Sequence, residues 1–372
     1  MCPLVNESAS SFHFQSLQIE LTNRCNLHCS TCLHSIPGID LFTQDLSFAA
    51  LSKVESILKN TDSVHLQGWG EILLLENLVK YIQWFKAHGC RVSLTTNGTL
   101  MTPARAETLI TSGLDAVTFS MAGVQEKTHD TLRGQGTHAQ LWQGMRNMYT
   151  ARKRWGKDAP AVAVSYLLTP ETFQELPQAI HRSRSCGISL FACIHQTHPV
   201  TKEQKAMCLW NTNADNQNKI IRRAFWQAFL ARIRLQLPSF TATLLPICDK
   251  NPVERCFIAA DGSVAPCVFL YPPHDKRAEK RGGGAESTNL PRKRFGSLTG
   301  EIMAEIWQKQ AYREFREVFL KRKFVYDRAM VKVGTDLDGI DQLERAREQI
   351  KNAFRTLPVP KWCSSCPKMK GL

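Results

Sequence analysis

Short apolar runs alternate with longer amphipathic segments through the first half of the sequence. The segments between the runs, such as 75–89 and 102–113, repeat apolar residues at intervals of three and four and end in glycine, as helices commonly do. Parallel strands need such crossover helices. The sequence therefore predicts an α/β fold, an open or partial (β/α)6 TIM-like barrel, with its functional groups at the carboxyl ends of the strands. The predicted strands are 16–22, 63–68, 91–97, 116–121, 161–169 and 188–195.

The overall composition suits a soluble globular protein. The chain has 372 residues, of which 43% are hydrophobic and 22% are charged. No segment reaches the roughly 18 uncharged apolar residues needed to span a bilayer, and the first residues lack the pattern of a secretory signal. We therefore expect a cytoplasmic location and no membrane partner. Thirteen cysteines in such a chain favour metal ligation or redox chemistry, because disulfides rarely persist in a reducing compartment.

The formal net charge of +14 allows nucleic acid, an acidic peptide or an anionic small molecule as a partner. Much of the excess lies in a glycine-containing polar run at 274–296, which is densest from Arg292 to Arg294. Runs of this composition are commonly solvated and disordered. We interpret the run as a mobile surface insertion rather than a docking site.

Three cysteines follow the first predicted strand with the spacing CxxxCxxC. Cys25, Cys29 and Cys32 begin three residues after this strand, at its carboxyl end. Structural zinc normally takes four ligands in two close pairs, so a zinc loop would need a distant residue such as His34 to complete it. Cubane iron-sulfur clusters also use four cysteines when they are fully ligated by protein. Three cysteines would leave one iron open to bind another molecule.

The next strands end in small and hydrogen-bonding residues. Small residues let backbone groups approach a ligand closely, although glycine-rich strand ends are usually only turns. The order of these residues, and their placement at one edge of the predicted sheet, make the set informative. Its members are Gly68, Trp69, Gly70 and Glu71 after the second strand, Thr96 and Asn97 after the third, Ser120 at the end of the fourth, and Arg133 further on.

The sixth predicted strand carries the one catalytic candidate. Side chains alternate along a strand, so Cys193 and His195 share a face, and one interpretation is that this face lets His195 reach the substrate space. A packed structural histidine with a fixed tautomer is the favoured alternative, because the sequence identifies no partner for the ring.

This set resembles the radical S-adenosylmethionine (radical SAM) superfamily over roughly residues 16–200. In that family the CxxxCxxC cysteines hold a [4Fe-4S] cluster, whose open iron chelates the amino and carboxylate groups of S-adenosylmethionine. The resemblance implies this role for Cys25, Cys29 and Cys32. It places residues 68–71 at the methionyl amine, Asn97 and Ser120 near the ribose and carboxylate, and Arg133 as a carboxylate partner.

One position departs from the family pattern. Many members carry an aromatic residue just before the third cysteine, where this chain has Thr31.

The resemblance implies one-electron reduction of the cluster, followed by cleavage of the sulfonium to methionine and a 5'-deoxyadenosyl radical. That radical takes a hydrogen atom from the substrate, while the barrel positions the reactants and keeps water away.

A second cysteine group lies downstream. Asp261 and Gly262 form an Asp-Gly turn signal in a run that reads as a β-hairpin. A hairpin cysteine and a distant CxxC can converge into a four-thiolate site, for zinc or for an iron-sulfur cluster, and composition does not choose between them. The group consists of Cys248, Cys256, Cys267, Cys363 and Cys366.

Residues 248–267, the segment 296–319 and the terminal CxxC resemble the SPASM or shorter twitch extension of radical SAM enzymes. This α+β extension carries one or two auxiliary [4Fe-4S] clusters. Five cysteines imply one cluster, with Cys267, Cys363 and Cys366 as ligands and Cys248 favoured as the fourth. Cys256 is an alternate ligand or a buried small hydrophobe.

We expect three parts: an N-terminal tail at 1–15, a core barrel at 16–238 and the extension at 239–372. Residues 301–320 predict one amphipathic helix, and 336–354 an inserted helix of no assigned role. The apolar side of the first helix carries Ile302, Ile306, Phe315 and Phe319, and Trp307 and Tyr312 are expected in the core.

Three functional classes fit the sequence. The first is a maturase that modifies a peptide, a protein or its cofactor, and the second is a dehydrogenase or epimerase of a sugar or aminocyclitol that uses the same chemistry. The third is a non-catalytic iron-sulfur or zinc scaffold that binds nucleic acid. A scaffold needs no open iron, so we expect an enzyme without a nucleic-acid partner. A flavodoxin-like or ferredoxin-like one-electron donor is implied by the resemblance.

Overall fold

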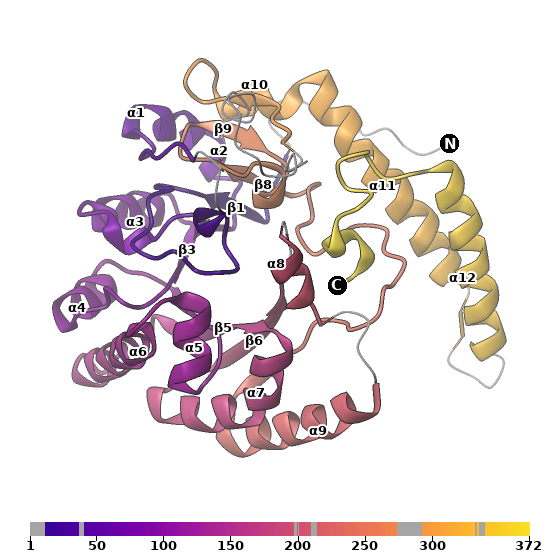
Figure 1. Cartoon of the computed structure of the whole chain (residues 1–372). Helices are drawn as coiled ribbons and strands as arrows, with labels where there is room; N and C mark the ends of the chain where they lie inside the picture. Colours follow the sequence, from indigo (N-terminus) through magenta and orange to yellow (C-terminus); the bar gives the residue numbers. More distant parts are fainter. Residues whose placement is uncertain are drawn as a thin grey trace.

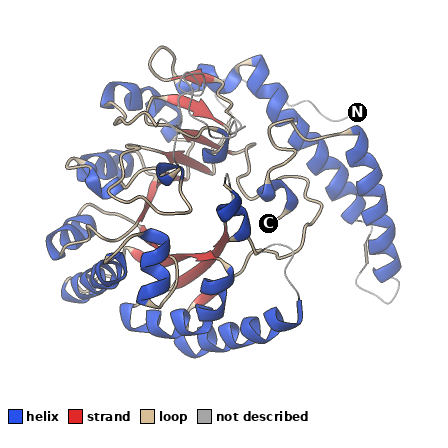
Figure 2. Ribbon diagram, in the orientation of Figure 1, coloured by secondary structure: helices blue, strands red, loops and turns tan. Residues whose placement is uncertain are grey.

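The computed structural model describes residues 12–36, 41–196, 199, 201–209, 214–273, 292–331, 333–334 and 339–372. In these residues one sheet of ten strands has the order β10-β9-β8-β1-β2-β3-β4-β5-β6-β7. Figures 1 and 2 show this sheet curving around the centre of the molecule, with helices on its outer side. The chain therefore forms the predicted partial barrel.

All six predicted strands are present, and neighbouring members pair in parallel. Two further strands, β7 and β8, extend the parallel sheet at its two ends. The strands are β1 (Ser16–Ile19), β2 (Ser63–Leu66), β3 (Arg91–Thr96), β4 (Ala116–Met121), β5 (Ala161–Leu168), β6 (Leu190–His195), β7 (Arg234–Gln236), β8 (Arg255–Ile258), β9 (Ser263–Ala265) and β10 (Gly296–Ser297).

Helices cross over between the barrel strands as the apolar periodicity predicts. Two of them begin at threonine caps, because Thr102 accepts from the backbone N–H of Arg105 and Thr169 forms a capping box with Thr172. The helices are α1 (Phe48–Leu51), α2 (Glu55–Leu58), α3 (Leu78–Ala87), α4 (Pro103–Thr111), α5 (Glu126–Arg133), α6 (Thr137–Arg154), α7 (Pro170–Ser183), α8 (Lys202–Ala206), α9 (Ala214–Ala231), α10 (Met303–Gln308), α11 (Gln310–Met330) and α12 (Gly339–Thr356). The described residues contain no helix long and apolar enough to pass through a bilayer.

The two faces of the sheet differ in polarity. Apolar side chains such as Leu17, Val64 and Val117 are fully buried against the helices. Alternate residues point into the barrel lumen and are mostly half-buried, and most of those of β1–β4 are polar. They include Gln18, His65, Ser93, Thr118 and Ser120. The core therefore lies between sheet and helices, and the lumen offers hydrogen-bonding groups to a ligand.

The predicted hairpin joins the extension to the barrel. Strands β8 and β9 pair antiparallel across the turn at Asp261 and Gly262, whose positive φ of 77° suits glycine. Strand β8 also pairs in parallel with β1, with Cys256 beside Leu17. The downstream cysteine segment is therefore part of the same sheet as the barrel.

The predicted single helix at 301–320 is wrong in one respect. The backbone of Lys309 leaves the helical region (φ −52°, ψ 136°), so that α10 and α11 form in its place. Ile306, Phe315 and Phe319 are buried as expected, whereas Ile302 is 41% exposed. The predicted inserted helix is α12, which packs on α11 as a hairpin projecting from the barrel (Figure 1).

The described end of the basic run, from Arg292 onward, differs from the predicted mobile surface insertion because it is packed against the protein. Residues 274–291 lie outside the described residues. The Arg292 guanidinium lies 4.2 Å from the ring centroid of Tyr271 and 5.4 Å from that of Phe42, and it pairs with Asp261 at 3.7 Å. The backbone N–H of Lys293 donates to the Leu270 carbonyl at 2.7 Å. The densest point of the run is therefore packed, because cation–π contacts hold it to the barrel.

Candidate cofactor sites

Cys25, Cys29 and Cys32 lie in a loop at the carboxyl end of β1. The hydroxyl of Ser35 donates to the carbonyls of Cys29 and Cys32, at 2.7 and 2.8 Å, which folds the loop back on itself. The backbone N–H of Ser30 donates to the Leu132 carbonyl at 2.9 Å, near the end of α5. The three thiols are half-buried. The loop therefore has a defined shape set by its own polar residues and by α5.

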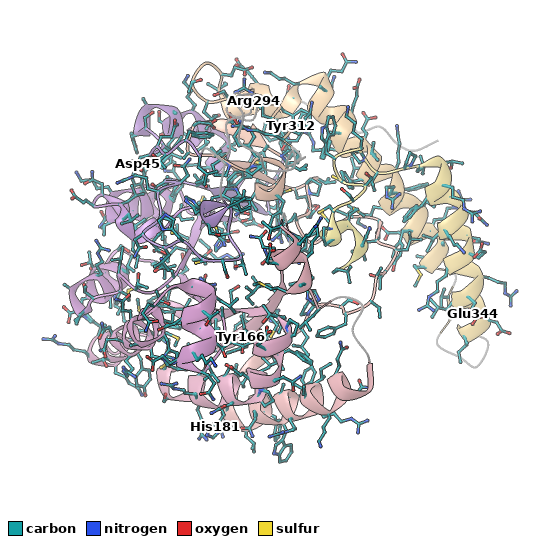
Figure 3. All side chains as sticks on the ribbon, viewed as in Figure 1. Asp45, Tyr166, His181, Arg294, Tyr312 and Glu344 are labelled. Carbon is teal, nitrogen blue, oxygen red and sulfur yellow. The ribbon has the colours of Figure 1, made fainter. Side chains whose placement is uncertain are left out.

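The start of the cysteine loop is anchored to residues 42–45. The Asn23 amide donates to the Phe42 carbonyl at 2.9 Å and accepts from the backbone N–H of Gln44 at 2.7 Å. Asp45, labelled in Figure 3, receives two hydrogen bonds from the Arg24 guanidinium, at 2.9 and 2.6 Å. This bidentate pair fixes the residue just before Cys25.

Positions 68 and 70 need a residue without a side chain, because the loop after β2 passes against the end of β1. A Cβ atom on Gly68 would lie 2.2 Å from a carboxylate oxygen of Glu20. A Cβ on Gly70 would lie 2.4 Å from the Thr22 carbonyl oxygen and 2.6 Å from that of Arg24. Those atoms are too close for any side chain, so both positions require glycine.

Glu20 holds the loop after β2 in place through hydrogen bonds. Its buried carboxylate accepts from the backbone N–H of Trp69 at 2.6 Å and from that of Ala260 at 3.1 Å. Burial raises the pKa of Glu20 to about 7, while these two hydrogen bonds act in the opposite direction. One carboxylate thus connects the end of β1, the loop after β2 and the hairpin turn of the extension.

Glu71 is buried and fully engaged. Its carboxylate accepts from the Thr96 hydroxyl at 2.6 Å and from the backbone N–H groups of Asn97 at 2.7 Å and Leu73 at 3.0 Å. Burial raises the pKa of Glu71 against the effect of these bonds. Thr96 is 1% exposed and lies on the helix-facing side, so the expectation that it contacts the cofactor is wrong. It positions the loops instead.

Asn97 connects the end of β3 to the cysteine loop. Its amide donates to the Asn26 side chain at 2.9 Å, and its carbonyl oxygen accepts from the backbone N–H of Thr99 at 2.9 Å. Ser120 lies further round the sheet, half-buried on the lumen face of β4. These side chains occupy the same end of the barrel as the three cysteines.

Arg133 ends α5 beside the cysteine loop. Its carbonyl lies 3.9 Å from the Cys29 sulfur, and its buried Nε has no hydrogen-bond partner among the described residues. Burial raises the pKa of the Cys32 thiol to about 11, and the Arg133 guanidinium acts against this rise. A buried guanidinium nitrogen without an acceptor suits an anionic group of a ligand.

His195 does not reach the lumen. It shares the helix-facing side of β6 with Cys193, is 1% exposed, and its Nε2 lies 2.9 Å from the Ser239 carbonyl oxygen. The Phe240 ring packs edge-on against it at 5.4 Å. His195 therefore agrees with the favoured interpretation of a packed histidine, because it belongs to the buried set of β6, which does not face the lumen.

Four downstream cysteines come together. Burial raises the pKa of the Cys267 thiol well above its usual range, and the negative charges of Cys248, Cys366 and Cys363 add to the rise. Burial likewise raises the pKa of Cys248 to about 11 and that of Cys363 to about 12. These four residues are half-buried, and thiols with raised pKa values ionise together only beside a compensating positive charge, which a bound metal centre supplies.

Cys256 lies outside this group. It is 2% exposed on β8, and the charge that acts on it is that of Arg316, not that of another cysteine. Burial raises the pKa of Tyr312, which is labelled in Figure 3, and the charge of Cys256 adds to this rise. Burial raises the pKa of Cys256 to about 12. The geometry therefore groups Cys248, rather than Cys256, with Cys267 and the terminal CxxC.

Both cysteine groups are too open for a single ion. Within the described residues, no three His, Cys, Asp or Glu side chains converge closely enough to hold one metal ion. Burial lowers the pKa of His34, the candidate completing ligand, and its ring bonds to the backbone of Trp69 instead. In a cubane each cysteine binds a different iron, so the sulfurs lie further apart than around zinc. The residues fit iron-sulfur clusters.

Sequence reasoning missed the residues that hold these loops in place. Glu20, Asn26 and Asp45 carry the connections, and only Glu20 leaves a signal in the sequence. It is the one ionisable residue in the predicted strand 16–22, and a buried charge is rare unless it is paired.

Comparison with known families agrees with this geometry. Residues 19–182 match the radical SAM superfamily, and residues 248–330 match SPASM, an iron-sulfur cluster-binding domain. The chain belongs to the radical SAM superfamily and carries a C-terminal SPASM extension. It therefore uses S-adenosylmethionine with an iron-sulfur cluster and has an auxiliary cluster-binding domain. Cys363 and Cys366 lie beyond the matched part of that domain.

Individual relatives cover most of the chain. The tungsten-containing aldehyde ferredoxin oxidoreductase cofactor-modifying protein of Pyrococcus furiosus is 25% identical over 83% of this chain and 85% of its own length. Mycofactocin maturase MftC of Mycolicibacterium smegmatis is 28% identical over 80% of this chain and 71% of its own.

Solved structures share the fold at low identity. The native anSMEcpe structure with bound AdoMet has a TM-score of 0.57 and 18% identity, and covers 92% of this chain and 97% of its own. Streptococcus suis SuiB bound to S-adenosylmethionine has a TM-score of 0.60 and 13% identity, over 83% of this chain and 68% of its own.

Proposed function

We propose that this protein reductively cleaves S-adenosylmethionine and uses the resulting radical to modify a peptide, a protein or a cofactor, as a maturase. The observation that carries the proposal is the convergence of the cysteine loop with the ends of β2 and β3 and with α5 at one end of the lumen. A non-catalytic scaffold would not need these loops to converge at one end of the lumen.

Cys25, Cys29 and Cys32 are the proposed cluster ligands. A cluster held by these residues would, with S-adenosylmethionine, supply one-electron reductive cleavage of the sulfonium and hydrogen-atom abstraction from the substrate. Asn26 and the Ser35 hydroxyl keep the loop in one shape.

The remaining residues bind and orient S-adenosylmethionine. Because the Glu71 carboxylate is engaged within the protein, residues 68–71 offer backbone carbonyls, rather than this side chain, to the methionyl amine. The unpartnered Nε of Arg133 is the proposed donor to the methionyl carboxylate. Ser120 and Asn97 are placed to hydrogen-bond the ribose from the strand ends.

Cys248, Cys267, Cys363 and Cys366 are the proposed ligands of one auxiliary cluster. Its place beside the lumen, with Cys267 on the hairpin that flanks β1, suits electron transfer to or from the substrate. A one-electron donor protein is the proposed partner. The maturase class is favoured over a sugar or aminocyclitol dehydrogenase because relatives whose names describe cofactor modification and mycofactocin maturation align over most of the chain.

Anaerobic reconstitution tests the proposal. The wild-type chain should bind about eight irons, S-adenosylmethionine should perturb the electron paramagnetic resonance spectrum, and dithionite should then yield 5'-deoxyadenosine. Changing Cys25, Cys29 and Cys32 to alanine should remove both signals and about four irons. Cys208→Ala, in a cysteine of neither group, is the control. Formation of 5'-deoxyadenosine by the triple variant would contradict the proposal.

A further inference from the structure

A second feature of the lumen is a cavity on the inner side of β1, β2 and β3. Its volume is about 420 Å³, within the range of small-molecule sites. It runs from the amino-terminal ends of the strands up to Gln67, just before the glycine-containing loop, and Cys267 forms part of its wall. We call it the lumen cavity. It connects the region of the cofactor loops with the auxiliary cysteine group.

The charged side chains that line the lumen cavity are all cations. Arg91, Lys250 and Arg255 line it, and no carboxylate does so within the part of the chain that the structure describes. None of these three side chains has a carboxylate ion-pair partner among the described residues. Cations gathered in a concave, partly desolvated site attract a counter-charge from outside the protein.

Hydrogen bonds hold the cavity wall in a fixed arrangement. The ring of His65 lies between Ser93 Oγ, 2.8 Å from Nδ1, and Gln67 Oε1, 2.9 Å from Nε2. The Arg255 Nε donates to Gln15 Oε1 at 2.9 Å and its Nη1 donates to the Asp249 carbonyl at 3.4 Å, which together restrain the guanidinium. Burial, together with the charge of Lys250, lowers the pKa of His65 to about 4. The wall is thus preorganised, with neutral hydrogen-bonding groups beside the cations.

We propose that the lumen cavity is a subsite for the anionic part of a small-molecule substrate, a carboxylate or phosphate group held by Lys250 and Arg255 with Arg91 at the rim. The inference rests on the proposed function and narrows its substrate class to anionic small molecules, including cofactors. An anion seated there leaves the rest of the substrate extending up the lumen toward the strand ends, where hydrogen abstraction takes place. It also keeps the substrate next to the Cys267 wall.

Calorimetry on the anaerobic holoprotein tests the subsite, with pyrophosphate and citrate as separate probes. We expect one of them to bind at sub-millimolar concentration, and the stronger probe identifies phosphate or carboxylate as the preferred group. The double variant Lys250→Gln with Arg255→Gln should weaken this binding at least tenfold. The matched control is Arg154→Gln with Lys323→Gln. Both of these side chains are exposed to solvent and lie outside the lumen cavity, and the loss of net charge is equal.

Equal binding by the double variant and its control would show a net-charge effect and overturn the proposal, as would the absence of wild-type binding up to about 5 mM. If the double variant loses iron or secondary structure, Arg91→Gln at the rim replaces it, with an expected loss of about threefold. Saturating probe should leave the spectral response to S-adenosylmethionine unchanged in the wild type. That response tests the proposed function separately, so either idea can fail alone.

Discussion

The carboxylate of Glu20 lies 2.6 Å from the backbone nitrogen of Trp69 and accepts its hydrogen. Its other oxygen accepts from Ala260, in the hairpin turn of the extension. A single buried side chain thus ties the loop proposed to hold the methionyl amine to the domain proposed to hold the auxiliary cluster. Movement of the loop after β2 would therefore shift the Glu20 carboxylate and, through its second hydrogen bond, the hairpin turn of the extension.

Glu20→Gln should change how stability depends on pH. Burial raises the folded-state pKa from 4.5 to about 7, so between these values the folded protein binds more protons than the unfolded chain. Stability therefore falls as pH rises through this window, by about 3 kcal/mol. Anaerobic unfolding at pH 6 and pH 8 should show a smaller difference for Glu20→Gln than for the wild type. An unchanged difference would refute the assignment of this pH dependence to Glu20.

Gly70→Ala should weaken S-adenosylmethionine binding about tenfold or more. The new methyl group would lie 2.4 Å from the Thr22 carbonyl oxygen, so the loop must move away from β1. Gly300→Ala is the matched control, because a Cβ there meets no atom within 4 Å. Binding is measured by titrating the spectral change of the cluster. Equal affinities of the two variants would show that the loop position is unimportant.

Cys248→Ala and Cys256→Ala should differ in iron content. We expect the first variant to lose the auxiliary cluster, about four irons, because Cys248 belongs to the group around Cys267. The second should keep its iron and lose only about 1 kcal/mol of stability from the small cavity it leaves. Iron analysis after anaerobic reconstitution gives the answer. The opposite pattern would make Cys256 the ligand.

Arg322→Met should loosen the α11–α12 hairpin, whose far part carries Glu344 in Figure 3. The buried guanidinium donates to the carbonyls of Leu245, Pro246 and Leu357, at 3.0, 3.3 and 2.6 Å, and stacks on Phe354 at 3.6 Å. Leaving these carbonyls unsatisfied should cost about 3 kcal/mol.

Thermal unfolding and limited proteolysis measure the effect of Arg322→Met, with Lys321→Met as the control, since that lysine is 51% exposed. Faster cleavage of the hairpin is expected only in the first variant. Similar cleavage of both proteins would mean that the stacking and the three hydrogen bonds do not hold the hairpin in place.

The sequence by itself determined the barrel and the first cysteine site. Six strands with crossover helices were predictable because apolar periodicity is a local property, and parallel pairing follows from the length of the connections. Cys25, Cys29 and Cys32 could be proposed as cluster ligands from the sequence because all three lie in one short loop after a strand, so no long-range folding is needed to bring them together.

Only the tertiary structure decided which distant residues meet. The side of β6 that is buried and the break at Lys309 depend on packing between elements far apart in the chain, and the same packing places Cys248, the fourth ligand favoured from the sequence, near Cys267. Strand alternation shows that His195 and Cys193 share a face, but helix packing selects which face is buried. The cations of the lumen cavity come from β3 and from the extension, and they become neighbours only when β8 pairs with β1.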